Sequence, residues 1–313
     1  MKITFVTTIF NEEKTIERLL HSLVQQTQLP DEVVIVDGGS TDATASVISN
    51  FQFPISNKFS KIILFEKKGN RSVGRNEGIT KATGDVIVLS DAGCVLDKDF
   101  IKEIVKPFSD KRVDVVAGYY RGEGKTIFQK CLIPYVLVMP DKVNSDAFLP
   151  ATRSMAIRKK VWSEMGGFPE EYSHNEDYVF AKKLQKHGKK IQFASKAIVM
   201  WIPRKNLKEA FTMFYRFALG DAEAGILRPK VIFLLARYSL GLVLTIFALY
   251  NDLWVLLWFL FILFILYLFW AIKKNYRYVS DPQAYYLLPI LQLVSDMAVI
   301  RGTVQGIIMR YGI

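Results

Sequence analysis

Four short apolar segments in the first part of the chain are each followed at once by charged or amide side chains. The segments are residues 3–8, 33–36, 62–65 and 86–90, and the side chains that follow them are Asn11 and Glu12, Asp37, Arg71 and Arg75, and Asp91. If the segments are parallel strands, their carboxyl ends share one edge of a sheet, and these side chains converge on one crevice. Carboxylates can hydrogen-bond a base or a ribose, and arginine can grip phosphate with two parallel donors. The set therefore predicts a nucleotide site.

Asp91 is the residue around which this site is expected to form. It follows the β-branched run of residues 86–90, and the small residues Ala92 and Gly93 leave space beside it. Mg²⁺ and Mn²⁺ bind one or two protein carboxylates together with phosphate oxygens. Asp91 therefore suits a metal-bridged diphosphate. The alternative for Asp91 alone is a strand-end acid that caps the next turn.

Helices are expected between these strands, so that strand and helix alternate along the chain. Ile16, Leu19, Leu20 and Leu23 recur at helical spacing, and a further helix is expected to open within residues 69–76. This alternation predicts an α/β fold with a parallel, doubly wound sheet. The first strand–helix turn lacks G-x-G-x-x-G and no P-loop is present, so a dinucleotide-dependent dehydrogenase is disfavoured.

The composition separates a globular part from an apolar part that begins after about residue 229. The formal net charge of +11 suits phosphorylated ligands, nucleic acid or an anionic membrane face. No Arg/Lys run with interleaved aromatic residues is present, so we expect no nucleic-acid partner. The two cysteines, Cys94 and Cys131, lack a metal-type spacing, which favours a reducing, cytosolic compartment for the globular part.

Four motifs taken together resemble the nucleotide-sugar-binding half of the family 2 glycosyltransferases. They are Thr8-Ile-Phe-Asn-Glu12, Asp37-Gly-Gly-Ser-Thr-Asp42, Gly74-Arg75-Asn76-Glu-Gly78 and Ser90-Asp91-Ala-Gly-Cys94, and they agree with the family in order and spacing. The resemblance runs through residues 1 to about 225. It implies the GT-A fold, which has a Rossmann-like mixed sheet, and an inverting transfer from a nucleotide-diphospho-sugar.

The resemblance also implies a role for each matched residue. Three of them, Thr8, Glu12 and Asp37, are expected to line the base and ribose. Arg71 and Arg75 are expected near the diphosphate, and Asp91 is expected to hold a divalent Mn or Mg ion. The chain departs from the family at Gly38 and Gly93, where many relatives have a further Asp. The metal then has one obvious protein carboxylate, with Asp97 as a candidate helper.

The second half of the globular part is expected to hold the acceptor. Arg153 and Ser154 fall where the resemblance places contacts to the donor sugar or phosphate. The segment from Gly166 to Asp177 resembles the family's catalytic-base motif, which implies that Asp177 is the base and that Glu176 orients it or contacts the acceptor. Acids at a helix start also complement the helix dipole, which is the alternative for this pair.

Two apolar segments of 20 residues each, 231–250 and 253–272, are long enough to cross a bilayer. Basic residues flank their outer ends, so the positive-inside rule predicts a multi-pass protein of the cell membrane with its catalytic domain in the cytoplasm. Residues 284–308 form either a third span or an interfacial helix. The charges of Asp296 and Arg301 favour the interfacial placement, because charges in the middle of a bilayer are costly.

The expected organisation is a cytosolic domain over residues 1–225 followed by a membrane domain over residues 226–313. The cytosolic domain comprises a nucleotide-sugar half, residues 1–98, and an acceptor half, residues 99–225. Residues 121–150 have no clean periodicity and are expected to form an insertion over the active site.

These features predict a membrane-bound inverting glycosyltransferase that moves a sugar from a UDP- or GDP-sugar to a lipid-linked or glycan acceptor. The lipid-linked acceptor is inferred from helices that hold the site at a membrane. The alternative is a membrane-tethered, non-catalytic nucleotide-sugar-binding protein, which the missing second acid near Asp91 favours. A nucleotidyltransferase is disfavoured because Asn11-Glu12-Glu13 replaces the expected Gly-rich basic loop, and the absence of Q-x-x-R-W near Arg216 weakens a polymerase.

Overall fold

The computed structural model describes residues 1–51 and 61–312 and divides the chain into two compact units. The first unit comprises Met1–Gly122 and Val138–Ile202, and the second comprises Glu123–Leu137 and Pro203–Ile313. Helix α8 (Leu207–Glu223) therefore groups with the apolar helices, although the sequence placed it in the first domain. Its packing against the last helix explains this grouping. The boundary at residue 225 as a division of function stays a prediction.

An eight-stranded mixed sheet forms the centre of the first unit, with strand order β3-β2-β1-β4-β7-β6-β8-β5. The strands are β1 (Ile3–Ile9), β2 (Glu32–Asp37), β3 (Lys61–Glu66), β4 (Val86–Leu89), β5 (Cys94–Leu96), β6 (Val115–Gly122), β7 (Met155–Arg158) and β8 (Ile191–Trp201). The first four strands are parallel, and β7 runs antiparallel to β4 and β6. The sheet is thus mixed, as the family resemblance implied, and its parallel part carries the ends that face the predicted crevice.

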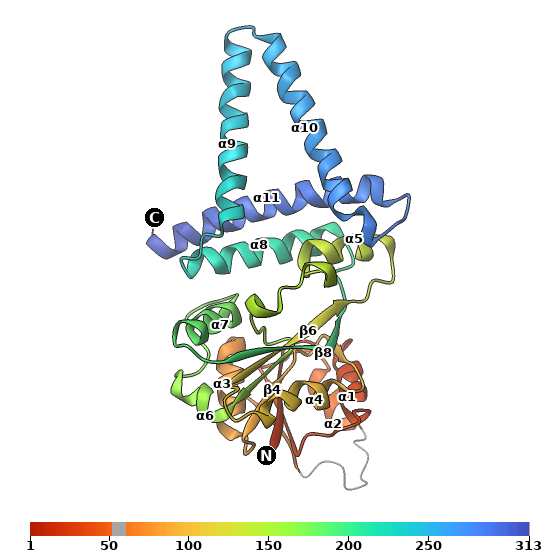
Figure 1. Ribbon diagram of the computed structural model, residues 1–313, viewed down its shortest axis with the longest axis vertical. Helices are drawn as coiled ribbons and strands as arrows, with labels where there is room; N and C mark the ends of the chain where they lie inside the picture. The colour runs from red at the N-terminus through yellow and green to blue at the C-terminus, as the bar shows by residue number, and fades with distance from the viewer. Residues whose placement is uncertain (52–60, 313) are drawn as a thin grey trace. The chain divides into compact units, whose positions relative to one another are not determined.

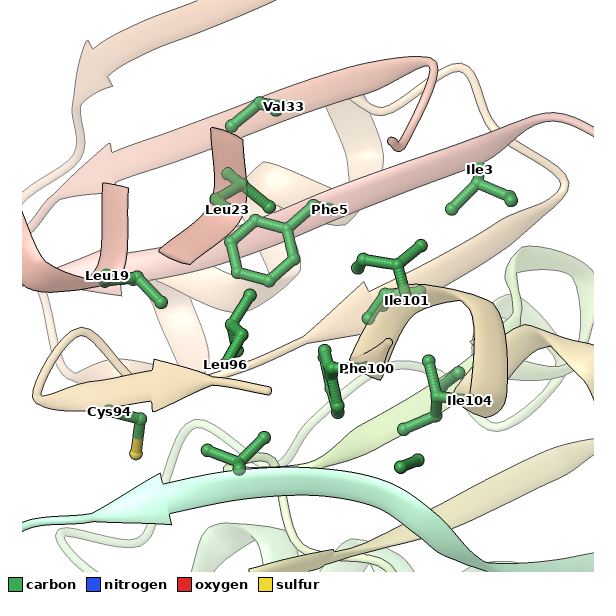
Figure 2. Packing of buried hydrophobic residues seen from close by; sticks show 14 of the residues in the cluster. Ile3, Phe5, Leu19, Leu23, Val33, Cys94, Leu96, Phe100, Ile101 and Ile104 are labelled. Atoms are coloured by element: carbon green, nitrogen blue, oxygen red, sulfur yellow. The ribbon is translucent and has the colours of Figure 1, made fainter. Parts of the chain in front are cut away.

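Helices cover both faces of this sheet. They are α1 (Ile16–Val24), α2 (Thr44–Asn50), α3 (Arg71–Lys81), α4 (Phe100–Val105), α6 (Lys159–Glu164) and α7 (Glu176–Lys186). On one face the side chains of α1 and α4 bury Phe5, and Figure 2 shows this ring among Leu19, Leu23 and Ile101. On the other face, helices α3, α6 and α7 pack against β1, β2, β4 and β7. The helical spacing from Ile16 to Leu23 therefore gives a buried helix, as predicted.

Residues 123–137 belong to the stretch that the sequence predicted to be an insertion, and they contain a helix. Helix α5 (Ile127–Val136) occupies them and begins at a capping box, in which Thr126 and Gln129 satisfy each other's backbone N–H groups. The Gln129 side chain also donates to the carbonyl of Pro203, at 2.9 Å, within the second unit. The sequence did not indicate this helix, because the irregular apolar pattern concealed it, and the placement of the stretch over the active site stays a prediction.

The second unit contains the three long apolar helices. They are α9 (Pro229–Tyr250), α10 (Trp254–Asn275) and α11 (Ala284–Tyr311), and all three are long and apolar enough to cross a membrane. Helices α9 and α10 form a hairpin whose apolar side chains are mostly exposed. Figure 1 shows α11 alongside α8 and transverse to this hairpin. Length and composition therefore make all three helices candidate membrane spans. Helix α11 differs from the other two because it packs along α8.

Two glycines bring α11 into backbone contact with α8. A Cβ added at Gly302 would lie 2.3 Å from the carbonyl oxygen of Tyr215, and one added at Gly306 would lie 2.6 Å from that of Leu219. Both distances are too short for any side chain, so only glycine permits this approach.

We expect Gly302→Leu to destabilise the second unit by about 1–3 kcal/mol, because overpacking a tight contact forces the backbones apart. The melting temperature of the detergent-purified chain would report this loss. Gly241→Leu on α9 is the matched control, since a Cβ there has no atom within 4 Å. Equal melting temperatures for the two variants would contradict the close approach.

Candidate functional site

Arg75 of α3 links the three elements that form the site. Its side chain is 5% exposed, and Nη2 lies 3.2 Å from Oδ1 of Asp91, while Nη1 donates to Oε1 of Glu176 on α7. Burial lowers the pKa of Arg75, but the carboxylates of Glu176, Asp91 and Asp177 outweigh burial and raise it above its ordinary value. The guanidinium is therefore a permanent cation between carboxylates from distant parts of the chain.

Asp91 lies two residues after the end of β4, at the sheet edge where the sequence predicted it. Its second oxygen, Oδ2, is 3.9 Å from Nε of Arg153, and 39% of its side chain is exposed. Burial raises the pKa of Asp91, but Arg75, Arg153 and Arg71 outweigh burial and hold the pKa below its ordinary value. Asp91 is therefore ionised at neutral pH and accessible to a ligand.

Arg153 approaches Asp91 from the segment before β7. Its guanidinium carbon lies 5.2 Å from the ring centre of Tyr120 and 5.4 Å from that of Trp201. Its Nε is buried and has no hydrogen-bond partner among the residues that the structure describes. An arginine that is held by aromatic rings and has a donor to spare is suited to binding phosphate.

Glu176 and Asp177 open α7 after a sharp turn at Asn175, whose φ is 59°. The side chain of Glu176 is 5% exposed and is occupied by Arg75, so Glu176 does more than complement the helix dipole. Asp177 accepts a hydrogen bond from the N–H of Tyr178, at 2.8 Å. Burial and then the adjacent Glu176 raise the pKa of Asp177, and the opposing effect of Arg75 does not cancel them. Asp177 is thus the carboxylate in this cluster that is suited to accept a proton.

The motif residue next to Arg75 supports the approach of α7 to α3. Asn76 Oδ1 accepts from the N–H of Phe168 at 2.8 Å, and Nδ2 donates to the Phe168 carbonyl and to Glu170, each at 2.8 Å. Asn76 therefore anchors the loop that leads to Glu176. The sequence did not indicate this role, which depends on contacts with residues far along the chain.

The loops after β1 and β2 are tied together by side-chain hydrogen bonds. Asp37 is buried, and its Oδ1 accepts from the N–H of Gly39, at 3.0 Å, and from the N–H and hydroxyl of Ser40, both at 2.8 Å. Asn11, which has a φ of 55°, accepts at 2.8 Å from the N–H of Thr41. Asn11 was expected among the side chains at this edge, but its hydrogen bond to the loop after β2 was not predicted. Asparagine tolerates the left-handed backbone conformation, and its side-chain amide can hydrogen-bond backbone groups of a neighbouring loop.

The remaining residues predicted on this edge make local contacts within the first unit. The Thr8 methyl group packs against α3, so a Cβ at Gly74 would lie 2.8 Å from it. The Glu12 N–H donates to the Thr44 hydroxyl at 2.8 Å, and its carboxylate accepts from Thr15. Arg71 is exposed in the first turn of α3. Contacts of Thr8, Glu12 and Arg71 with a nucleotide stay predictions.

Ser154 and Asp97 lie outside the cluster. The side chain of Ser154 is fully buried, and its hydroxyl donates to the carbonyl of Ala197 at 3.4 Å, because it points between β6 and β8. The Asp97 carboxylate accepts from the N–H of Asp99 at 3.1 Å and so caps its own turn. We therefore do not include Ser154 among the proposed donor contacts or Asp97 among the metal ligands.

The residues around Asp91 can accommodate a divalent ion bound to a diphosphate. No group of three or more His, Cys, Asp or Glu side chains that could hold a metal occurs among the described residues. A Cβ built on Gly93 would have nothing within 4 Å, so open space lies at the position of the missing acid. One carboxylate with space beside it fits Mg²⁺ or Mn²⁺ whose remaining ligands are phosphate oxygens and water. Asp91 would be the protein ligand.

The chain matches two family models. The model described as "Glycosyl transferase family 2" matches residues 4–155, and the model described as "Glycosyl transferase family group 2" matches residues 86–273. The second match covers more than half of the chain.

Similar curated proteins include two glycosyltransferases. The O-antigen chain rhamnosyltransferase RfbN of Salmonella typhimurium is 25% identical over 69% of this chain and 71% of its own length. The glycosyltransferase AglE of Haloferax volcanii is 24% identical over 82% of this chain and 81% of its own length.

A solved structure with a similar fold is the mannosyltransferase PcManGT from Pyrobaculum calidifontis in complex with GDP-Man and Mn²⁺. Its TM-score is 0.56 at 21% identity, and the match covers 71% of this chain and 62% of that chain. S. aureus TarS has a TM-score of 0.51 at 21% identity, over 71% of this chain and 40% of that chain. The chain thus spans less than two thirds of these solved structures, and the likeness concerns the fold.

Proposed function

Because this chain belongs to the family 2 glycosyltransferases and has a GT-A-like fold, we propose that it transfers a sugar, with inversion, from a nucleotide-diphospho-sugar to a lipid-linked acceptor. The observation that carries the proposal is the cluster in which Arg75 bridges Asp91 and Glu176 beside Asp177. The cluster combines cations for a diphosphate with a carboxylate whose pKa is raised. Solved structures of similar fold were determined in complex with UDP-GlcNAc and with GDP-Man, which supports a UDP- or GDP-sugar as donor.

In the proposed mechanism, Asp177 accepts the proton of an acceptor hydroxyl as its oxygen attacks the anomeric carbon. The bond from that carbon to the diphosphate oxygen breaks on the opposite face, so one displacement inverts the configuration. Arg75 and Arg153, with Arg71 at the rim, stabilise the negative charge that develops on the leaving diphosphate. A divalent ion bound at Asp91 would neutralise further charge on the diphosphate, and the presence of Mn²⁺ in the PcManGT complex supports this role.

The pH dependence of transfer should reflect the raised pKa of Asp177. A base must be deprotonated, so the rate is expected to fall as the pH falls through a value above the ordinary Asp pKa of about 3.9. Glu176→Gln removes the adjacent negative charge and lowers the pKa of Asp177, so the acid limb of the kcat profile should move to lower pH. Glu17→Gln, at an exposed carboxylate on α1, is the control and should leave the limb in place. An acid limb that Glu176→Gln leaves unmoved would argue against Asp177 as the base.

Donor turnover by the detergent-purified chain tests the proposed reaction. Release of nucleoside diphosphate would be measured for UDP- and GDP-sugars with Mn²⁺ or Mg²⁺, with and without a polyprenyl phosphate. We expect release from one donor that requires metal and rises with the lipid. Nucleotide-sugar binding without release under every condition would overturn the proposal and favour the tethered binding protein.

We further propose that the α9–α10 hairpin crosses the membrane and that α11 lies along its surface, with the catalytic unit in the cytoplasm. Basic residues lie at the start of α9 and at the end of α10, including Lys230, Lys273 and Lys274. They support the placement of both these helix ends on the cytoplasmic side of the membrane. Burial along α8 and the transverse course of α11 support a surface placement for α11 (Figure 1). A site held at the membrane in this way favours a lipid-linked acceptor.

This topology predicts that the C-terminus and the catalytic unit share one side of the membrane. In intact bacterial cells that express the chain, an impermeant maleimide should label Asn251→Cys at the hairpin tip but not Tyr311→Cys. Both variants should react after permeabilisation, and the native Cys94 and Cys131 are buried and give little background. Labelling of Tyr311→Cys in intact cells would mean that α11 crosses as a third span.

A further inference from the structure

A buried carboxylate on α11 organises a polar cluster with the hairpin helices. Asp296 is 5% exposed, and its Oδ2 accepts from the hydroxyls of Tyr238 and Tyr267, at 2.9 and 2.5 Å, and from Nη2 of Arg237, at 3.1 Å. Its Oδ1 accepts from Nε2 of Gln292 at 2.9 Å. These donors come from α9, α10 and α11, so the carboxylate is fully satisfied and held in one position.

Arg237, in contrast, is only half engaged. Its Nη2 contacts Asp296 and the Tyr267 hydroxyl, the latter at 2.9 Å, whereas Nε and Nη1 have no hydrogen-bond partner among the residues that the structure describes. The Tyr267 ring lies 3.9 Å from the guanidinium carbon, and 46% of the Arg237 side chain is exposed. The guanidinium is therefore fixed in orientation by Nη2, while the Nε–H and Nη1–H groups of this partly exposed side chain keep donors for a ligand.

The position of Arg237 along the hairpin indicates which ligand could meet these two donors. Arg237 stands eight residues after Pro229, where α9 begins, and Tyr267 stands eight residues before Asn275, where α10 ends. Both residues therefore lie about 12 Å along the helix from these ends. Between Arg237 and the tip of the α9–α10 hairpin, the surface is apolar and exposed, as Val243 and Phe259 illustrate. A long arginine side chain at this depth can reach the phosphate level of a bilayer.

We propose that Arg237 is a binding site for the phosphate of a lipid, with the lipid's apolar chain lying along the α9–α10 hairpin. The Nε–H and Nη1–H groups of Arg237 can each donate to a phosphate oxygen, and these hydrogen bonds would be strengthened by the opposite charges. Asp296 holds the guanidinium in place and balances its charge when no lipid is bound. This proposal deepens the proposed function, on which its membrane placement rests, because it identifies where a lipid-linked acceptor would be recognised.

A purely structural role for this pair makes a different prediction. If Arg237 only docks α11 onto the hairpin, removing both charges in Arg237→Gln/Asp296→Asn should restore whatever Arg237→Gln alone loses, since the neutral side chains can still hydrogen-bond. If Arg237 binds a phosphate, the double variant regains stability but not lipid binding.

Native mass spectrometry of the detergent-purified full chain would measure lipid binding, with no donor present and in the Asp177→Asn background. The probe is a polyprenyl phosphate, and the polyprenol of equal chain length is its matched control. We expect about a tenfold preference for the phosphate form that Arg237→Gln abolishes. Arg301→Gln, which removes an exposed cation from α11, should keep the preference.

Competition separates the sources of the phosphate. Displacement by phosphatidylglycerol would support a lipid phosphate site that is open to bulk lipid, and failure to displace would support one specific to the polyprenyl phosphate. Displacement by inorganic phosphate alone at similar concentration would overturn the lipid part of the proposal. A phosphate preference that survives Arg237→Gln, or returns in the double variant, would overturn the site. Because catalysis is not measured, binding can succeed even if the proposed transfer reaction fails.

Discussion

Asp177→Asn is expected to lower the rate of sugar transfer by about a thousandfold while leaving donor binding intact, in line with the loss of a general base. Asparagine keeps the size of the side chain and can still accept from the N–H of Tyr178, so the start of α7 should be unchanged. It cannot accept the proton of an acceptor hydroxyl. Steady-state kcat and an equilibrium titration with the nucleotide-sugar would separate the two effects.

Asp146→Asn is the matched control for this experiment, because Asp146 lies in the same unit and is exposed. It should transfer sugar at the rate of the unchanged chain. If Asp177→Asn also retains most of its rate, then Asp177 is not the base. A joint loss of donor binding would instead show that Asp177 holds the donor.

Arg75→Gln is expected to have the largest effect on stability in the first unit. It leaves Glu176, which is 5% exposed, without a countercharge, and breaking a buried pair of this kind costs about 3–5 kcal/mol. Asp91 would lose its nearest cation as well, so affinity for the donor diphosphate should also fall. Thermal unfolding and donor titration of the same preparation would measure both losses.

Two further variants test the reason for this effect. Arg75→Lys should not restore donor affinity, because a single ammonium cannot span Asp91 and Glu176 with a planar fork. Arg75→Gln/Glu176→Gln removes the uncompensated charge and should recover much of the stability, although transfer stays low. A single Arg75→Gln variant that melts at the normal temperature would refute the bridging role.

Much of the first unit could be predicted from local pattern. The apolar runs ending near Thr8, Val36 and Leu89 form the predicted parallel strands, and the spacing of Ile16 and Leu19 gives the predicted helix. Such patterns are informative because a strand or helix buries a fixed set of positions, whatever it packs against. The capping box at Thr126 was equally local, yet the irregular apolar pattern around it concealed α5.

The candidate site was predicted as a set of residues, but its connections were not. Asp91, Arg75 and Asp177 lie in one cluster, which agrees with the order of the motifs. Their chemical roles stay predictions. Ser154, one residue from Arg153, points into the sheet instead, because neighbouring residues near a strand face opposite sides.

The sequence by itself determined the α/β alternation, the edge at which acids and arginines gather, and the three long apolar helices. Only the tertiary structure decided that Arg75 meets Glu176, 101 residues away, and that Arg237 meets Asp296, 59 residues away. The physical reason is that local periodicity specifies which face of an element is buried, whereas long-range packing selects its neighbour. A buried charge needs an opposite charge beside it, and the tertiary fold decides which residue supplies that charge.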